Sequence, residues 1–136
     1  DAFFDRIVAE WAESGRGLYA VERRGDGRLI GLTGLHRAAF EASFTPCIEI
    51  GWRFVAEVWG QGYATEAARA VLHDAFGRLG LPRVYSFTAE RVMRRLGMRN
   101  LGGFDHPALP VGHLLRRHVL YAAARDTFEG RFSVRP

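Results

Sequence analysis

The chain has 136 residues, of which 48% are apolar and 25% charged, a composition typical of one globular domain with a single core. No apolar run approaches the ~20 residues of a membrane-spanning helix, and no signal peptide is visible. The single cysteine, Cys47, excludes an internal disulfide. We therefore expect a soluble, cytoplasmic protein. All nineteen basic residues are arginine, which excludes a Schiff-base or P-loop lysine, and the net charge of +4 is modest.

The first half of the chain reads as one helix followed by three strands. Phe4, Ile7, Val8 and Trp11 recur at helical spacing, and Ser14 and Gly15 provide a stop. Strands are expected over residues 18–23, 28–37 and 47–54, with a glycine-containing turn over residues 24–27.

The second half begins with a long periodic helix over residues 64–79, which Gly80 and Pro82 end. We expect a strand over residues 83–88, a short helix over 90–96, a short strand over 98–101 and a last strand over 114–124. Strands and helices mixed in this way indicate an α/β or α+β fold.

The junction between the third strand and the long helix, residues 59–67 (WGQGYATEA), is the most informative segment. Gly60 and Gly62 allow the backbone to approach a ligand closely. The helix start beyond them offers unpaired N–H groups and positive dipole charge. The sequence therefore predicts a site that holds phosphate groups mainly through main chain.

Glu49-Ile50-Gly51-Trp52 followed by this segment resembles the GNAT superfamily of N-acetyltransferases, in its RimJ/RimL-type branch. The acetyl-CoA signature of that family, Gln/Arg-x-x-Gly-x-Gly/Ala, reads here as residues 59–64. Residues 91–98 and the tail over 104–121 are also similar to members of the branch. The resemblance implies the GNAT fold: a central mixed, splayed β-sheet flanked by helices.

The resemblance also implies how the domain is delimited. Residues 1–136 would form a single GNAT domain that lacks the family's first strand and first helix. A loop that usually carries an Asn and a Ser would be missing between Ala89 and Glu90.

The resemblance implies acetyl-CoA as the co-substrate and assigns it binding residues. A backbone N–H near Phe54 and Val55 would polarise the thioester carbonyl. The N–H groups of the glycine segment would hold the diphosphate; they belong to Gln61, Gly62, Tyr63, Ala64 and Thr65, and the Thr65 hydroxyl would help.

Glu49 is the first candidate for a general base, because it is the only carboxylate in an apolar strand and burial would raise its pKa. A structural ion pair with an arginine is the alternative. His36 is the second candidate for a base, although a lone histidine there is more often structural. For a general acid, the resemblance points to a position occupied here by Met93, which cannot donate. Tyr121 remains, either as the acid or as a core residue with its hydroxyl satisfied.

No metal is expected, because the spacing of His106, His113 and His118 fits no standard zinc pattern. Cys47 is more typical of a buried small side chain than of a nucleophile. The pairs Arg94-Arg95 and Arg116-Arg117 either are solvated or meet the 3′-phosphate of CoA. Acceptor specificity is expected on the loops over residues 38–46 and 104–115.

Three functions therefore compete. The leading one is an acetyl-CoA-dependent N-acetyltransferase that acts on a protein α-amino group or a small-molecule amine. The alternative is a non-catalytic acyl-CoA-binding domain. Nucleic-acid binding is disfavoured because the arginines are scattered along the chain. We expect no membrane partner, and the family resemblance suggests a homodimer.

Overall fold

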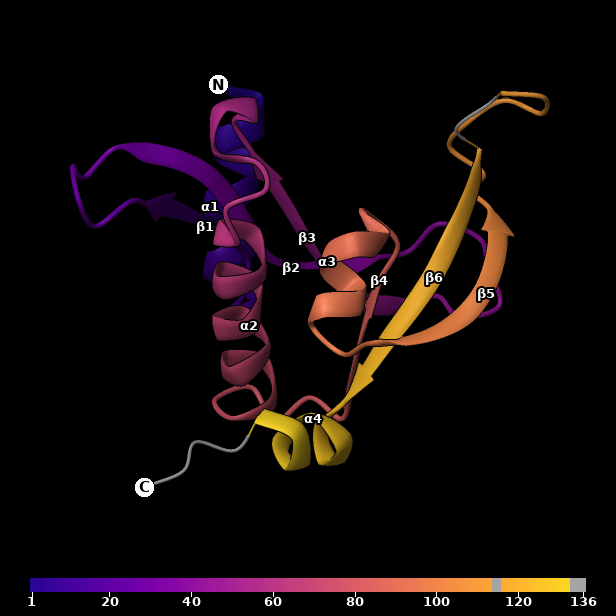
Figure 1. Ribbon diagram of the computed structural model, residues 1–136. Coiled ribbons are helices and arrows are strands. Elements are labelled where there is room, and N and C mark those ends of the chain that lie inside the picture. The colour runs from indigo at the N-terminus through magenta and orange to yellow at the C-terminus, as the bar shows by residue number, and fades with distance from the viewer. Residues whose placement is uncertain (114–115, 133–136) are drawn as a thin grey trace.

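The computed structural model describes residues 1–113 and 116–132 (Figure 1). Its helices are α1 (Ala2–Ser14), the short 3₁₀ helix η1 (Ala56–Val58), α2 (Tyr63–Phe76), α3 (Glu90–Arg95) and α4 (Arg125–Phe132). Its strands are β1 (Leu18–Glu22), β2 (Leu29–Ala38), β3 (Cys47–Phe54), β4 (Arg83–Ser86), β5 (Arg99–Asp105) and β6 (Arg117–Ala124). None of the helices in these ranges is long and apolar enough to cross a membrane.

The strands form one mixed sheet of six strands in the order β1-β2-β3-β4-β6-β5. Neighbouring strands are antiparallel except β3 and β4, which run parallel and pair at Glu49 and Tyr85. Beyond that point β3 continues to Phe54 while β4 has ended at Ser86. The sheet is therefore splayed at its centre, as Figure 1 shows.

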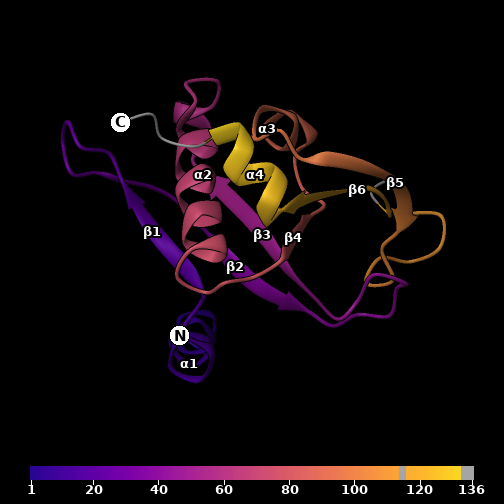
Figure 2. The same ribbon diagram turned by 90° about the horizontal axis from the view of Figure 1, so that it is seen from below.

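The helices lie on both faces of the sheet. Figure 2 shows α2, α3 and α4 on one side and α1 on the other. The main core lies under α2, where Leu72 of the helix and Ile50 and Val84 of the central strands are fully buried. Alternation along the strands sends the neighbouring side chains, such as Glu49, to the α1 face.

The ends of the long elements follow local chemistry. Asp1 caps α1 by accepting a hydrogen bond from the N–H of Phe3, and Gly15 ends the helix in the left-handed conformation with φ 70°. Gly62 is the N-cap residue of helix α2; it is also left-handed, with φ 86°, and makes no side-chain capping hydrogen bond.

The sheet flanked by helices confirms the predicted fold class, and β3 has the predicted bounds. Several details differ. Helix α2 ends at Phe76, before the predicted residue 79, and β4 ends at Ser86, before the predicted residue 88. The strand after Gly97 is longer than predicted and runs over Arg99–Asp105. The helix α4 was not predicted, and residues 114–115 of the last predicted strand lie outside the described residues. The predicted apolar face of α1 is largely exposed, at 62% for Phe4 and 50% for Val8.

Candidate active site

The glycine segment bends the chain between η1 and α2. Gly60 and Gly62 have φ values of 78° and 86°, a left-handed backbone that residues with a Cβ rarely adopt. Space around both positions is open, since a Cβ added at either would meet no atom within 4 Å. The glycines are therefore required by backbone conformation, and the bend leaves the start of α2 accessible to a ligand.

A cavity of about 440 Å³, here called the donor cavity, opens in front of this bend. It lies where β3 and β4 diverge and is bounded by the end of β3, the start of α2, and α3 with the loop before it. Its lining residues are Trp52, Arg53, Phe54, Val58, Trp59, Gly60, Gly62, Tyr63, Ala64, Thr65, Thr88, Ala89, Arg91, Val92 and Arg95. Arginine supplies the only charged side chains among them, so the lining favours an anion.

The structure brings most of the predicted cofactor residues to this cavity. Phe54, Gly62, Tyr63, Ala64 and Thr65 line it. Val55 does not line it, and the Val55 N–H is already engaged, since it donates to the carbonyl of Ile30 at 3.0 Å. Gln61 is also outside the lining, and its side-chain amide donates to the carbonyl of Glu57 at 3.2 Å.

The hydrogen-bond direction along β3 then identifies which N–H groups face the donor cavity. In an antiparallel ladder, successive residues point their N–H and C=O groups to opposite neighbours. The Val55 N–H points to β2, whereas the Ile50 carbonyl accepts from the Ser86 hydroxyl on the β4 side. Trp52 and Phe54 lie two and four residues after Ile50, so their backbone groups point to the same side as those of Ile50. Their N–H groups therefore point into the gap between the splayed strands.

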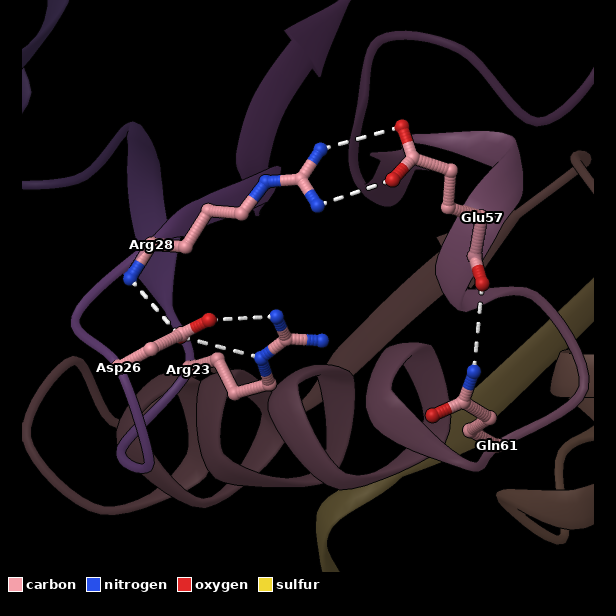
Figure 3. A network of polar contacts seen from close by, with 5 residues as sticks. All are labelled: Arg23, Asp26, Arg28, Glu57 and Gln61. Atoms are coloured by element: carbon pink, nitrogen blue, oxygen red, sulfur yellow. Dashed lines mark hydrogen bonds and ion pairs between the residues drawn. The ribbon is translucent and has the colours of Figure 1, made fainter.

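A polar network braces the approach to the bend (Figure 3). Arg28 donates two hydrogen bonds to the Glu57 carboxylate, at 2.9 and 3.1 Å. In the same turn, Asp26 accepts from the Arg28 N–H and from the Arg23 side chain. The turn between β1 and β2 is thereby tied to η1, and through Glu57 to Gln61.

A second cavity, of about 520 Å³, lies on the α1 face of the sheet and is here called the acceptor cavity. It is lined by Phe3, Arg6, Ile7, Glu10, Leu18, Leu32, Gly34, His36, Glu49, Gly51, Trp52 and Arg53. The two cavities share Trp52 and Arg53, so they meet at β3. The two cavities therefore adjoin the same part of β3.

Glu49 lies in the acceptor cavity, half-buried on β3. Burial raises the pKa of this carboxyl to about 7, and the positive charge of His36 opposes that rise. His36 is the register partner of Glu49 on β2. Its Nδ1 lies 3.4 Å from a carboxylate oxygen of Glu10, which α1 brings to the same cavity. The site thus holds a carboxyl able to exchange a proton near neutral pH.

Comparison with known proteins identifies the family. A model of the acetyltransferase (GNAT) domain matches residues 1–99. The chain belongs to the GNAT acetyltransferase family.

Three relatives illustrate the likeness. An uncharacterised N-acetyltransferase of Bacillus subtilis, YnaD, is 37% identical over 84 residues, which are 57% of this chain and 49% of that protein. A GNAT-family acetyltransferase from Bacillus anthracis has a TM-score of 0.66 at 30% identity, over 80% of this chain and 66% of the other. A ribosomal-protein-S5-alanine acetyltransferase from Vibrio fischeri has a TM-score of 0.72 at 16% identity, over 93% and 71%. This GNAT chain spans about half the length of the curated relatives it matches.

Tyr121 lies apart from both cavities of this GNAT domain. It is 3% exposed, and its hydroxyl donates to the Glu90 carboxylate at 3.0 Å. Arg94 also contacts that hydroxyl and forms an ion pair with Glu90. Of the arginine pair Arg94-Arg95, which the sequence offered as a possible phosphate contact, only Arg95 lines the donor cavity. Tyr121 is therefore a core residue with its hydroxyl satisfied, which was the alternative to a role as general acid. Met93, at the position where the family resemblance placed an acid, is fully buried.

The two loops expected to select the acceptor meet in one aromatic cluster. Its members are all half-buried: Phe40, Phe44, Tyr85, Phe87, Phe104, His106 and His118. Phe44 and Phe104 contact edge to face, with ring centroids 4.9 Å apart, and His106 lies 4.2 Å from Phe40. Burial, with the neighbouring His118, lowers the pKa of His106. Within the described residues, no group of three or more His, Cys, Asp or Glu is placed to hold a metal.

Sequence reasoning missed several residues of the site. Arg91 joins Arg95 in the donor cavity, and their spacing of four residues at a helix start was the available signal. Glu10 shares a helical face with Phe3 and Ile7, which also line the acceptor cavity. Cys47 is half-buried and burial raises the pKa of its thiol to about 11, which disfavours the reactive thiolate.

Proposed function

We propose that this domain is an acetyl-CoA-dependent N-acetyltransferase that moves an acetyl group to a primary amine in a ternary complex. The observation that carries the proposal is the meeting of the two cavities at Trp52 and Arg53, with Glu49 in one and the glycine bend in the other. Two reactants held on either side of β3 would react as if joined, which in favourable cases removes ~7–11 kcal/mol of the barrier.

The donor cavity fits the anionic part of acetyl-CoA. The uncapped start of α2 offers N–H groups to the diphosphate, and Gly62 lets the ligand approach the backbone. Arg91 and Arg95 would meet further phosphate charge. The thioester would then lie in the splay, where the Phe54 N–H replaces Val55 as the donor to its carbonyl oxygen. One such donor is worth ~3 kcal/mol in comparable acyl transfer.

Glu49 supplies the base. An amine is mostly protonated at neutral pH and must lose a proton before its nitrogen attacks the thioester carbon. The Glu49 carboxylate, with its pKa near 7, accepts that proton. The C–N bond forms, the C–S bond breaks, and the departing thiolate takes up a proton. Thiols have a pKa near ~8.5, so a dedicated acid such as Tyr121 is not needed.

The proposed acceptor is a primary amine that binds in the acceptor cavity. A protein α-amino group or a small amine would enter from the α1 side, past Phe3 and Ile7. The likeness to an S5-alanine acetyltransferase and the sequence resemblance together support the RimJ/RimL-type branch.

The test is thiol release from acetyl-CoA with a panel of amines and N-terminal peptides, comparing wild type with Glu49→Gln. We expect the substitution to lower kcat by ~10²–10⁴-fold and to leave the affinity for acetyl-CoA unchanged. Glu22→Gln, an exposed carboxylate on β1, is the matched control and should behave as wild type. Binding of acetyl-CoA without transfer to any acceptor would instead favour the non-catalytic acyl-CoA-binding domain.

A further inference from the structure

We propose that His36, held by Glu10, carries the proton from Glu49 to solvent during acetyl transfer. The inference rests on the proposed function and adds a positioning role for two residues. An ammonium acceptor has three N–H protons; the amide product keeps one, the CoA thiol takes one, and one is released per turnover.

That released proton begins on Glu49, which is half-buried between α1 and the sheet. Because only part of this carboxyl is exposed, a neighbouring side chain that reaches the surface shortens the path of its proton from the cavity to bulk water. Glu49 must lose this proton before it can accept the next one, so a direct exit route favours turnover.

His36 is placed to be that route. It is the partner of Glu49 across the β2–β3 ladder. Val55 and Gly51 of β3 direct their backbone groups toward β2, and Glu49, an even number of residues away, does the same. His36 and Glu49 are therefore a hydrogen-bonded pair, and their side chains lie on the same face of the sheet. The side chain of His36 is 58% exposed, so the ring spans from the cavity to solvent. Imidazole is the side chain best suited to exchange protons near neutral pH.

Glu10 completes the arrangement. Its carboxylate is 25% exposed and lies 3.4 Å from Nδ1 of His36. An imidazole held through Nδ1 keeps its other nitrogen, Nε2, in a fixed direction. Glu10 also stabilises the imidazolium that forms while the proton is in transit.

The other charged and titratable groups facing Glu49 do not offer the same path. They are Arg6 from α1, Cys47 and Arg53 from β3, and Tyr85 from β4. Arginine stays protonated, and the Cys47 thiol, with its pKa raised to about 11, stays neutral at pH 7. The Tyr85 hydroxyl accepts from Arg83 at 3.3 Å.

The experiment compares wild type with His36→Ala in steady-state acetyl transfer, across pH and at increasing imidazole concentration. We expect kcat to fall by at least about tenfold, less than for loss of the base itself, and the acid limb of the pH profile to move to higher pH. Added imidazole should restore kcat of the variant in proportion to its concentration and leave wild type unchanged. Glu10→Gln should lower kcat more mildly, with KM for acetyl-CoA unchanged.

His73→Ala is the matched control, because His73 is exposed on α2 and lines neither cavity. It should have wild-type kcat at all pH values. Wild-type kcat in His36→Ala, or a deficit that imidazole does not relieve, would overturn the relay. Failure of the proposed function is distinguishable, because then wild type itself would transfer no acetyl group to any acceptor.

Discussion

Burial of Glu49 favours its proposed role as a base but lowers the stability of the folded domain. Its carboxyl is half-buried, and the resulting desolvation raises its pKa from 4.5 to about 7. The unfolded chain would ionise this group at a lower pH than the folded chain does. Folding therefore becomes less favourable as the pH rises from 4.5 to about 7, and the full penalty applies above that range. A carboxyl whose pKa is shifted this far in a cavity is a candidate for a role in a site.

The first prediction concerns the free energy of unfolding, which should rise when the buried charge of Glu49 is removed. Glu49→Gln should stabilise the domain by roughly 1–3 kcal/mol at pH 8, because an amide does not ionise in the buried position. The gain should disappear below about pH 4.5, where the carboxyl is protonated in both states. Urea unfolding at the two pH values measures it. Equal stability of wild type and variant at pH 8 would mean that Glu49 is not desolvated.

The contacts between elements hold the two cavities in register. The network of Figure 3 links the β1–β2 turn to η1, immediately before the glycine bend. Most of its members are exposed, so its ion pairs add little to the stability of the fold. Pairing also neutralises the Glu57 carboxylate, which would otherwise repel an anion bound at the bend.

Arg28→Ala tests this network. We expect KM for acetyl-CoA to rise by up to about fivefold, with kcat unchanged and with the stability of the fold close to that of wild type. Arg24→Ala removes an exposed arginine from the same turn and is the control. If both variants raised KM equally, general loss of positive charge would explain the effect and the network would not.

The aromatic cluster links two loops that are far apart in sequence. Phe44 comes from the β2–β3 connection and contacts Phe104 at the end of β5. Phe44 contacts Tyr85, which pairs with Glu49 across β3 and β4, so we propose that the cluster fixes one side of the acceptor approach.

Phe44→Ala should destabilise the domain by ~2 kcal/mol, about half the cost of a fully buried Phe. KM for the acceptor should rise, whereas KM for acetyl-CoA should not. Phe4→Ala, at a position 62% exposed on α1, provides a comparison of equal volume. Thermal unfolding and two-substrate kinetics report both effects, and a parallel rise in both KM values would contradict the assigned side of the sheet.

At the scale of the whole molecule, the sequence predicted local features better than distant ones. Helix α2 and strand β3 could be predicted because each carries a strong period, and Gly60 and Gly62 mark the bend between them. Helix α4 was missed because its charged segment has little apolar periodicity; in the described part, Phe128 anchors it against Phe76.

The acceptor cavity could not be predicted, since it depends on where α1 lies against the sheet. No motif links Glu10 to His36, although tertiary packing brings them within 3.4 Å. The choice between Phe54 and Val55 depended in the same way on the pairing with β2, which only the folded sheet defines.

The central claim is that the bend at Gly62 binds the donor next to the acceptor cavity, and calorimetry with acetyl-CoA tests it most directly. Gly62→Ala and Gly80→Ala both force a side chain into a left-handed backbone, with φ of 86° and 63°, but only Gly62 lines the donor cavity. We predict that wild type and Gly80→Ala bind acetyl-CoA with a similar Kd below ~1 mM, whereas Gly62→Ala binds about tenfold more weakly. Absence of binding by wild type, or equal weakening by the two substitutions, would contradict the account.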